Sequence, residues 1–106
     1  MGHSLALEIY ELSSLFPKEE TFGLSSQIKR AAVSIPVNIA EGCGRKTKKD
    51  FSHFIQIAIG SACEVECELL LACDLGYISE VQCAKTCERI NELRRKMIAF
   101  GNKLND

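Results

Sequence analysis

Apolar residues recur at alternating steps of three and four along most of the chain, a spacing that gathers side chains on one face of an α-helix. Four such segments follow one another, over about residues 4–16, 24–41, 47–76 and 79–104. Their apolar lines are Leu5, Ile9, Leu12 and Phe16; Leu24, Ile28, Ala31, Ile35 and Ile39; Phe51, Ile55, Ala58, Ala62, Val65, Leu69 and Ala72; and Cys83, Cys87, Ile90, Leu93, Met97, Phe100 and Leu104. The pattern predicts four amphipathic helices and no strand.

The ends of these segments carry residues that start and stop helices. Pro17 closes the first segment, and the Gly-Cys-Gly run at residues 42–44 stops the second. Ser79 has Gln82 three residues after it, the spacing of a capping box. Short turns between four amphipathic helices predict an all-α fold, an antiparallel up-down four-helix bundle that forms a single domain over residues 1–106.

Pro36 lies inside the second predicted helix. Because proline has no amide hydrogen, the carbonyl of Ala32 loses its helical donor, and we predict a kink at Pro36. One line of polar side chains runs along the same helix and consists of Gln27, Arg30, Ser34, Asn38, Glu41 and Arg45. This line is either an exposed stripe or a buried network that fixes packing or assembly. The candidate assembly residues are Gln27, Ser34, Asn38 and Glu41.

The second and third predicted helices each carry another apolar line. Its members are Val33, Val37 and Ala40 on the second helix, and Phe54, Ile57 and Ser61 on the third. A helix that is apolar on two sides must bury both of them. In a domain of 106 residues we expect the second side to meet another subunit, which predicts a homo-oligomer.

The formal net charge of −1 conceals an uneven distribution of charge. Residues 25–49 carry a net charge of +5, residues 64–92 carry −5, and residues 93–106 carry +3. The candidate nucleic-acid contacts are the cations of the first segment, Lys29, Arg30, Arg45, Lys46, Lys48 and Lys49. The alternative is that these cations only solvate a turn. The acidic residues Glu64, Glu66, Glu68 and Glu88 are interpreted as a solvated surface or as partners of the basic face between subunits.

The stretch GCGRKTKK, residues 42–49, contains the Lys-Thr pair of a phosphate-binding loop. The rest of that motif is missing, because Arg45 and Ala40 replace the two glycines and a helix precedes the stretch in place of a strand. A nucleotide site is therefore excluded. Thr47 has Asp50 three residues after it and begins a predicted helix, whose first amides attract anions. We expect a phosphate of a polymer at this position.

The six cysteines do not have the placement of a metal site. When the third helix folds back on the fourth, Cys67 comes level with Cys87. Cys73 comes near Cys83, but Cys63 lies about one turn away, too far to share a tetrahedral ion. Small thiols buried in the bundle core are the simpler interpretation. A di-iron site and a Ser-His-Asp site both lack the residues they need, so we expect no metal, no cofactor and no enzymatic activity.

The stretch from Leu24 to Phe51, LSSQIKRAAVSIPVNIAEGCGRKTKKDF, resembles the four-helix-bundle proteins encoded within bacterial 23S rRNA intervening sequences. The segments FPKEETFGL and IAIGSACEVECELLLACDLGYIS are similar to the same family, so the resemblance covers nearly the whole chain. It implies an antiparallel four-helix bundle, assembly as a pentamer ring and no established catalytic activity. One branch of the family, the accessory protein of diversity-generating retroelements, works with a reverse transcriptase and binds nucleic acid.

Two functional hypotheses follow. The first is a non-enzymatic, ring-forming bundle that binds RNA or DNA backbone through the six candidate cations, with Arg94, Arg95 and Lys96 extending the surface. The second is a protein–protein scaffold whose charged faces meet between subunits or with a polymerase-like partner. Apolar runs of only a few residues predict no membrane span. The first residues show no basic leader before an apolar block, so the expected location is cytoplasmic.

Overall fold

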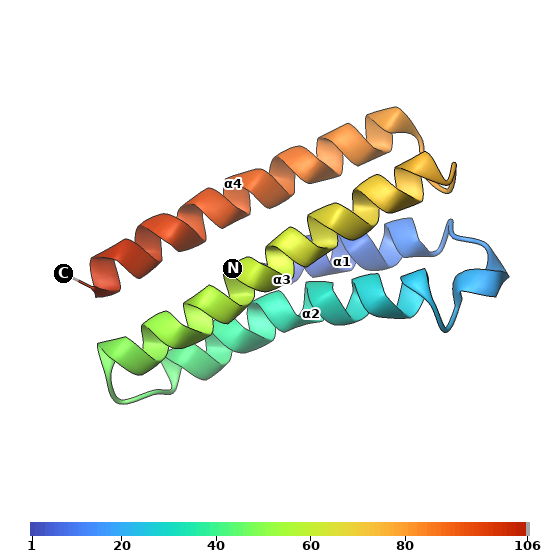
Figure 1. Cartoon of the computed structure of the whole chain (residues 1–106). Helices are drawn as coiled ribbons and strands as arrows, with labels where there is room; N and C mark the ends of the chain where they lie inside the picture. Colours follow the sequence, from blue (N-terminus) through green and yellow to red (C-terminus); the bar gives the residue numbers. More distant parts are fainter. Residues whose placement is uncertain (106) are drawn as a thin grey trace.

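The computed structural model describes residues 1–105 and contains four α-helices in that part of the chain. They are α1 (His3–Ser13), α2 (Leu24–Cys43), α3 (Lys48–Asp74) and α4 (Glu80–Leu104), with a short 3₁₀ turn, η1 (Lys18–Glu20), between α1 and α2. No strand occurs within these residues, and the prediction of an all-α four-helix fold is confirmed. Figure 1 shows that each helix runs back along the one before it.

The starts of α3 and α4 follow the capping residues in the sequence. Thr47 Oγ1 accepts a hydrogen bond from the Asp50 amide at 3.1 Å, which satisfies one of the free amides at the start of α3. At α4 the box is complete, because the Ser79 side chain accepts from the Gln82 amide while the Gln82 side chain accepts from the Ser79 amide.

Helix α1 ends earlier, and helix α2 ends later, than the sequence pattern predicts. Helix α1 ends at Ser13, and Phe16 is buried from the turn that follows rather than from the helix. Helix α2 contains Pro36 and continues as helix to Cys43. The kink at Pro36 stays a prediction.

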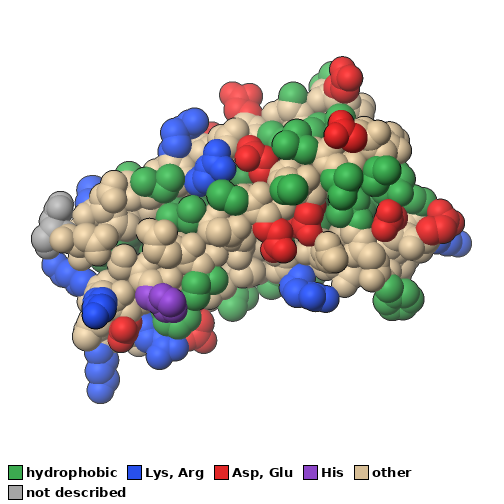
Figure 2. Space-filling view, in the orientation of Figure 1, with side chains coloured by type: hydrophobic (Ala, Val, Ile, Leu, Met, Phe, Trp, Pro, Cys, Tyr) green, Lys and Arg blue, Asp and Glu red, His purple; other side chains and the backbone are tan. Residues whose placement is uncertain are grey.

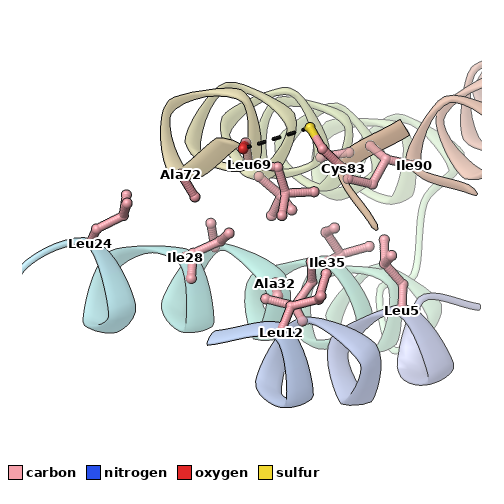
Figure 3. Close-up of a cluster of buried hydrophobic side chains, with 14 of the residues drawn as sticks. Leu5, Leu12, Leu24, Ile28, Ala32, Ile35, Leu69, Ala72, Cys83 and Ile90 are labelled. Carbon is pink, nitrogen blue, oxygen red and sulfur yellow. Dashed lines mark hydrogen bonds between the residues drawn. The ribbon is translucent and has the colours of Figure 1, made fainter. Parts of the chain in front are cut away.

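The core lies where the predicted apolar lines of the four helices meet (Figure 3). On α3 every member of the line after Phe51 is buried, as are Ile28, Ile35 and Ile90 on the neighbouring helices. Close to the α3–α4 turn, the Cys83 thiol lies 3.8 Å from the carbonyl oxygen of Leu69, the contact drawn as a dashed line in Figure 3. Removal of apolar surface from water at these positions is the main source of stability.

Helix α3 packs against both α2 and α4, and α1 packs against α2. Polar side chains connect α1 to α4. Glu8 accepts a hydrogen bond from Thr86 at 2.9 Å and forms an ion pair with Arg89, which also donates to Ser4 at 3.2 Å. Among the described helices, none is long and apolar enough to cross a membrane.

Candidate nucleic-acid interface

Four of the six candidate cations lie together where α2 turns into α3. Arg45 and Lys46 belong to the turn, and Lys48 and Lys49 open α3 directly after the N-cap Thr47. We call Arg45, Lys46, Lys48 and Lys49 the basic turn, and all four side chains are exposed. In Figure 2, Lys and Arg side chains gather at the left end of the molecule, where Figure 1 places this turn.

The cations of the basic turn differ in how far they are already paired. Arg45 lies 3.3 Å from the Glu41 carboxylate, and its guanidinium lies over the Phe54 ring at 4.6 Å. This pair is exposed, so it holds Arg45 only weakly. Within residues 1–105, no ion pair involves Lys46, Lys48 or Lys49. Three lysines are therefore available to an external anion.

The start of α3 adds a second source of positive potential. The first amides of a helix point outward without helical acceptors, and the helix dipole gives this end a partial positive charge. Thr47 satisfies the Asp50 amide, and the Asp50 carboxylate in the first turn cancels part of the potential. The arrangement suits a phosphate that contacts lysine side chains and backbone amides together.

Lys29 and Arg30 lie elsewhere on α2. They precede the end of α2 at Cys43 by about 20 Å of helix at ~1.5 Å per residue. Lys29 lies over the Tyr10 ring at 5.3 Å, and Arg30 donates to Ser26 at 3.4 Å. The structure therefore divides the six candidate cations into a compact group of four and a separate pair.

The end of α4 lies at the same end of the bundle as the basic turn. The Phe51 and Phe100 rings are 5.2 Å apart, which sets the register between the start of α3 and the end of α4. The exposed Lys103 lies one turn beyond Phe100 on α4, more than fifty residues from the basic turn in sequence. By contrast, Arg94 pairs with Glu66 at 3.5 Å, further back along the bundle. The position of Lys103 at this end of the bundle follows from the sequence only if the residues of α3 are first aligned with those of α4.

The predicted polar line on α2 separates into buried and exposed parts. Ser34 Oγ lies 2.8 Å from Ser61 Oγ of α3. The Asn38 side chain donates to the Ser34 carbonyl at 2.7 Å and to its hydroxyl at 2.8 Å. A part-buried network thus connects α2 to α3, whereas Gln27 and Glu41 are exposed.

Glu68 corrects the interpretation of the acidic segment as a solvated surface. Only 7% of this residue is exposed, and its Oε1 atom is buried without a hydrogen-bond partner. Burial, and to a smaller extent the negative charge of Glu64, raises the pKa of the Glu68 carboxyl from 4.5 to about 7. One weak signal of this burial is present in the sequence, because Glu68 immediately precedes Leu69 on the core line.

The prediction that the cysteines fill the core holds for only half of them. Cys83 is buried, Cys73 and Cys87 are half-buried, and their thiols lie together, with 3.9 Å between the sulfurs of Cys83 and Cys87. Burial raises the pKa of all three thiols. The other three, Cys43, Cys63 and Cys67, are exposed, and the expectation that they are buried is wrong. In the described part of the chain, no group of three or more His, Cys, Asp or Glu side chains is arranged to hold a metal ion.

The fold and this site define the chain as a small all-α protein of four helices with a basic turn at one end. It belongs to the family described as 23S rRNA-intervening sequence protein, which matches residues 1–99. Among solved structures, it is similar to a protein of unknown function from the S23 ribosomal protein family of Bacteroides thetaiotaomicron VPI-5482. The two are 27% identical over 93% of each chain, with a TM-score of 0.87. No curated protein matches the sequence.

Proposed function

We propose that this protein is a non-enzymatic, oligomeric helical bundle that binds the phosphate backbone of RNA or DNA through its basic turn. The observation that carries the proposal is the presence of three exposed lysines without carboxylate partners around the start of α3. Family membership supports it, because one branch that the family resemblance includes, the accessory protein of diversity-generating retroelements, binds nucleic acid.

The basic turn favours contact with the backbone over readout of bases. The two phenylalanine rings close to the turn already have partners. The Phe51 ring packs against Phe100, and the Arg45 guanidinium lies over the Phe54 ring. Neither of these phenylalanine rings is therefore free to stack on a base, and the exposed His53 ring nearby lies edge-on to Phe54 at 5.5 Å. Lysine ammonium groups act as point charges on phosphates, which gives binding that depends on salt and little on sequence.

Binding to generic RNA and DNA duplexes at several salt concentrations tests the proposal. With three to four phosphate contacts per chain, the logarithm of affinity should fall against the logarithm of salt with a slope of about −3 per bound subunit. Reversal of Lys46, Lys48 and Lys49 to Glu should abolish retention. The matched control is Lys85→Glu on α4, an exposed lysine remote from the turn. Absence of binding by the wild-type protein even at low salt would refute the proposal.

A second candidate function is a protein–protein scaffold, favoured by an apolar groove between α1 and α2. The groove has a volume of about 420 Å³, and its lining consists of His3, Ala6, Leu7, Tyr10, Val33, Pro36, Val37 and Ala40. Leu7 and Val37 are each more than half exposed, at 56% and 51%. Apolar groups concentrated on one face of a small protein favour association.

Assembly as a homo-oligomer would cover this groove, and the family resemblance favours a pentamer. Sedimentation velocity measures the mass of the assembled protein. The scaffold function predicts that reversing Arg45 and Lys46 to Glu changes that mass. The nucleic-acid function predicts the opposite result, in which the mass is unchanged and nucleic-acid retention is lost.

A further inference from the structure

The last turns of α3 expose a strip of apolar side chains on the outside of the bundle. Leu71 and Leu75 are one turn apart and about half exposed, at 49% and 50%. Leu70 beside them is 51% exposed, and Cys67, one turn before Leu71, is exposed as well. Figure 2 shows hydrophobic side chains gathered over this end of α3, which Figure 1 places away from the basic turn. We call Cys67, Leu70, Leu71 and Leu75 the α3 ridge.

The charges on α3 beside this ridge are all negative. Asp74 lies one turn after Leu70 and is exposed, and the exposed Glu64 lies about one turn before Cys67. No lysine or arginine occurs over residues 64–84. In the described part of the chain, no ion pair involves Asp74. The ridge is therefore an apolar surface with an unpaired carboxylate at its margin.

The apolar groove between α1 and α2 has the opposite charge at its edge. Lys29 Nζ lies 5.3 Å from the centre of the Tyr10 ring, which lines the groove, and among the residues that the structure describes no carboxylate pairs with it. The groove follows α1 from His3 to Tyr10, about 10 Å of helix, and the ridge from Cys67 to Leu75 is about 12 Å long. The ridge and the groove agree in length and in apolar character, and their charges are opposite.

We propose that the α3 ridge of one copy of this chain docks in the α1–α2 groove of a second copy. Leu71 and Leu75 then pack beside Leu7 in the groove, and Asp74 pairs with Lys29 across the contact. The inference rests on the proposed homo-oligomer and identifies the two surfaces that meet in it. A row of side chains on one helix that enters the groove between two others is the ordinary way in which helices pack.

The charges also decide that unlike surfaces meet. Two ridges face to face would bring Asp74 of one copy towards Asp74 of the other, and two grooves would do the same for Lys29. Like charges at a contact oppose association, whereas a ridge in a groove brings opposite charges together. This contact leaves each copy with one groove and one ridge still to fill, so it repeats until a ring closes or a filament grows. A second copy is favoured over a different protein as the occupant, because the chain itself carries the matching groove.

Charge reversal on both sides of the contact tests the inference by sedimentation velocity over a dilution series. Lys29→Glu and Asp74→Lys should each raise the concentration at half-assembly about tenfold, because each brings like charges together. A chain with both reversals should assemble nearly as the wild type does, since the pair is restored with its signs exchanged. An equal mixture of the two single variants should also regain association, because each groove then meets a ridge of opposite charge on the other variant.

Further variants separate the contact from general effects of charge and from loss of the fold. Lys85→Glu and Glu88→Lys, at exposed positions on α4, are the matched controls and should leave assembly unchanged. Leu71→Ser removes an apolar side chain of the ridge and should raise the concentration at half-assembly about tenfold. Because Leu71 is half exposed in the separate chain, the urea midpoint of the dilute variant should equal that of the wild type.

The outcomes distinguish this contact from assembly in general. Single reversals that assemble like the wild type would overturn the inference and leave the homo-oligomer standing. A double variant and a mixture that both stay as weak as the single variants would do the same. A wild-type protein that stays monomeric at every concentration would overturn both the homo-oligomer and this contact.

Discussion

Gly42 is the position at which the smallest change should have a large structural effect. It is buried at the end of α2, with helical backbone geometry. A Cβ atom at Gly42 would lie 2.6 Å from Cδ1 and 3.0 Å from Cε1 of the Phe51 ring, and 3.1 Å from Cβ of Phe54. Ordinary contacts between such atoms are about 3.5–4.0 Å, so Gly42→Ala requires the Phe51 ring to move by roughly an ångström. That ring packs against Phe100 on α4, which transmits the disturbance across the bundle.

The magnitude follows from two opposing terms. Overpacking of a close-packed site costs about 1–3 kcal/mol, and replacing a helical glycine by alanine recovers about 0.5–1 kcal/mol. We expect Gly42→Ala to lower the free energy of unfolding by about 1–2 kcal/mol. The control is Gly60→Ala in the middle of α3, where an added Cβ meets nothing within 4 Å. This second variant should raise the free energy of unfolding by about 0.5–1 kcal/mol.

Equilibrium unfolding in urea, followed by far-ultraviolet circular dichroism at one protein concentration, measures both variants. With a denaturant slope of about 1–2 kcal/mol/M, the midpoint should fall by roughly 1 M for Gly42→Ala and rise by roughly 0.5 M for Gly60→Ala. The opposite signs make the test independent of the general effect of alanine on helices. A Gly42→Ala midpoint at or above that of the wild type would show that the packing against Phe51 is not close.

Three further measurements test other parts of the structure. Ser34→Ala and Ser61→Ala should each cost about 1 kcal/mol, and the double variant should cost clearly less than their sum, because both remove the same hydrogen bond; additive losses would contradict the contact. At concentrations where the chain is dissociated, the free energy of unfolding should fall as pH rises from 4.5 to about 7, since the folded state binds the Glu68 proton more tightly than the unfolded state does. An equal fall in Glu68→Gln would refute that assignment. A thiol reagent at mildly alkaline pH should modify the three exposed cysteines before the three whose pKa burial raises, and uniform rates by mass spectrometry would contradict the cluster.

The helices and their buried faces were predictable from sequence because they depend on local periodicity. The line on α3 from Ile55 to Ala72 is buried throughout, as its alternating spacing predicts. The starts of α3 and α4 were predictable for the same reason, since each cap joins residues only three positions apart. The basic turn was also visible, because its four cations are near neighbours in the chain.

The contacts between helices were decided by the tertiary structure, because they depend on how the residues of one helix align with those of the next. Whether Ser34 meets Ser61, or Phe51 meets Phe100, is set by how two apolar lines interlock across a hairpin, and a shift of one turn would change the partners. Burial of Glu68 has the same origin, because a residue at the margin of the core line of α3 is enclosed only when the neighbouring helices pack against that line. The sequence by itself determined four helices, their inner faces and a cluster of cations. The packing of those helices determined which charges are paired, which are exposed and which one is buried alone, because these properties belong to contacts between segments distant in the chain.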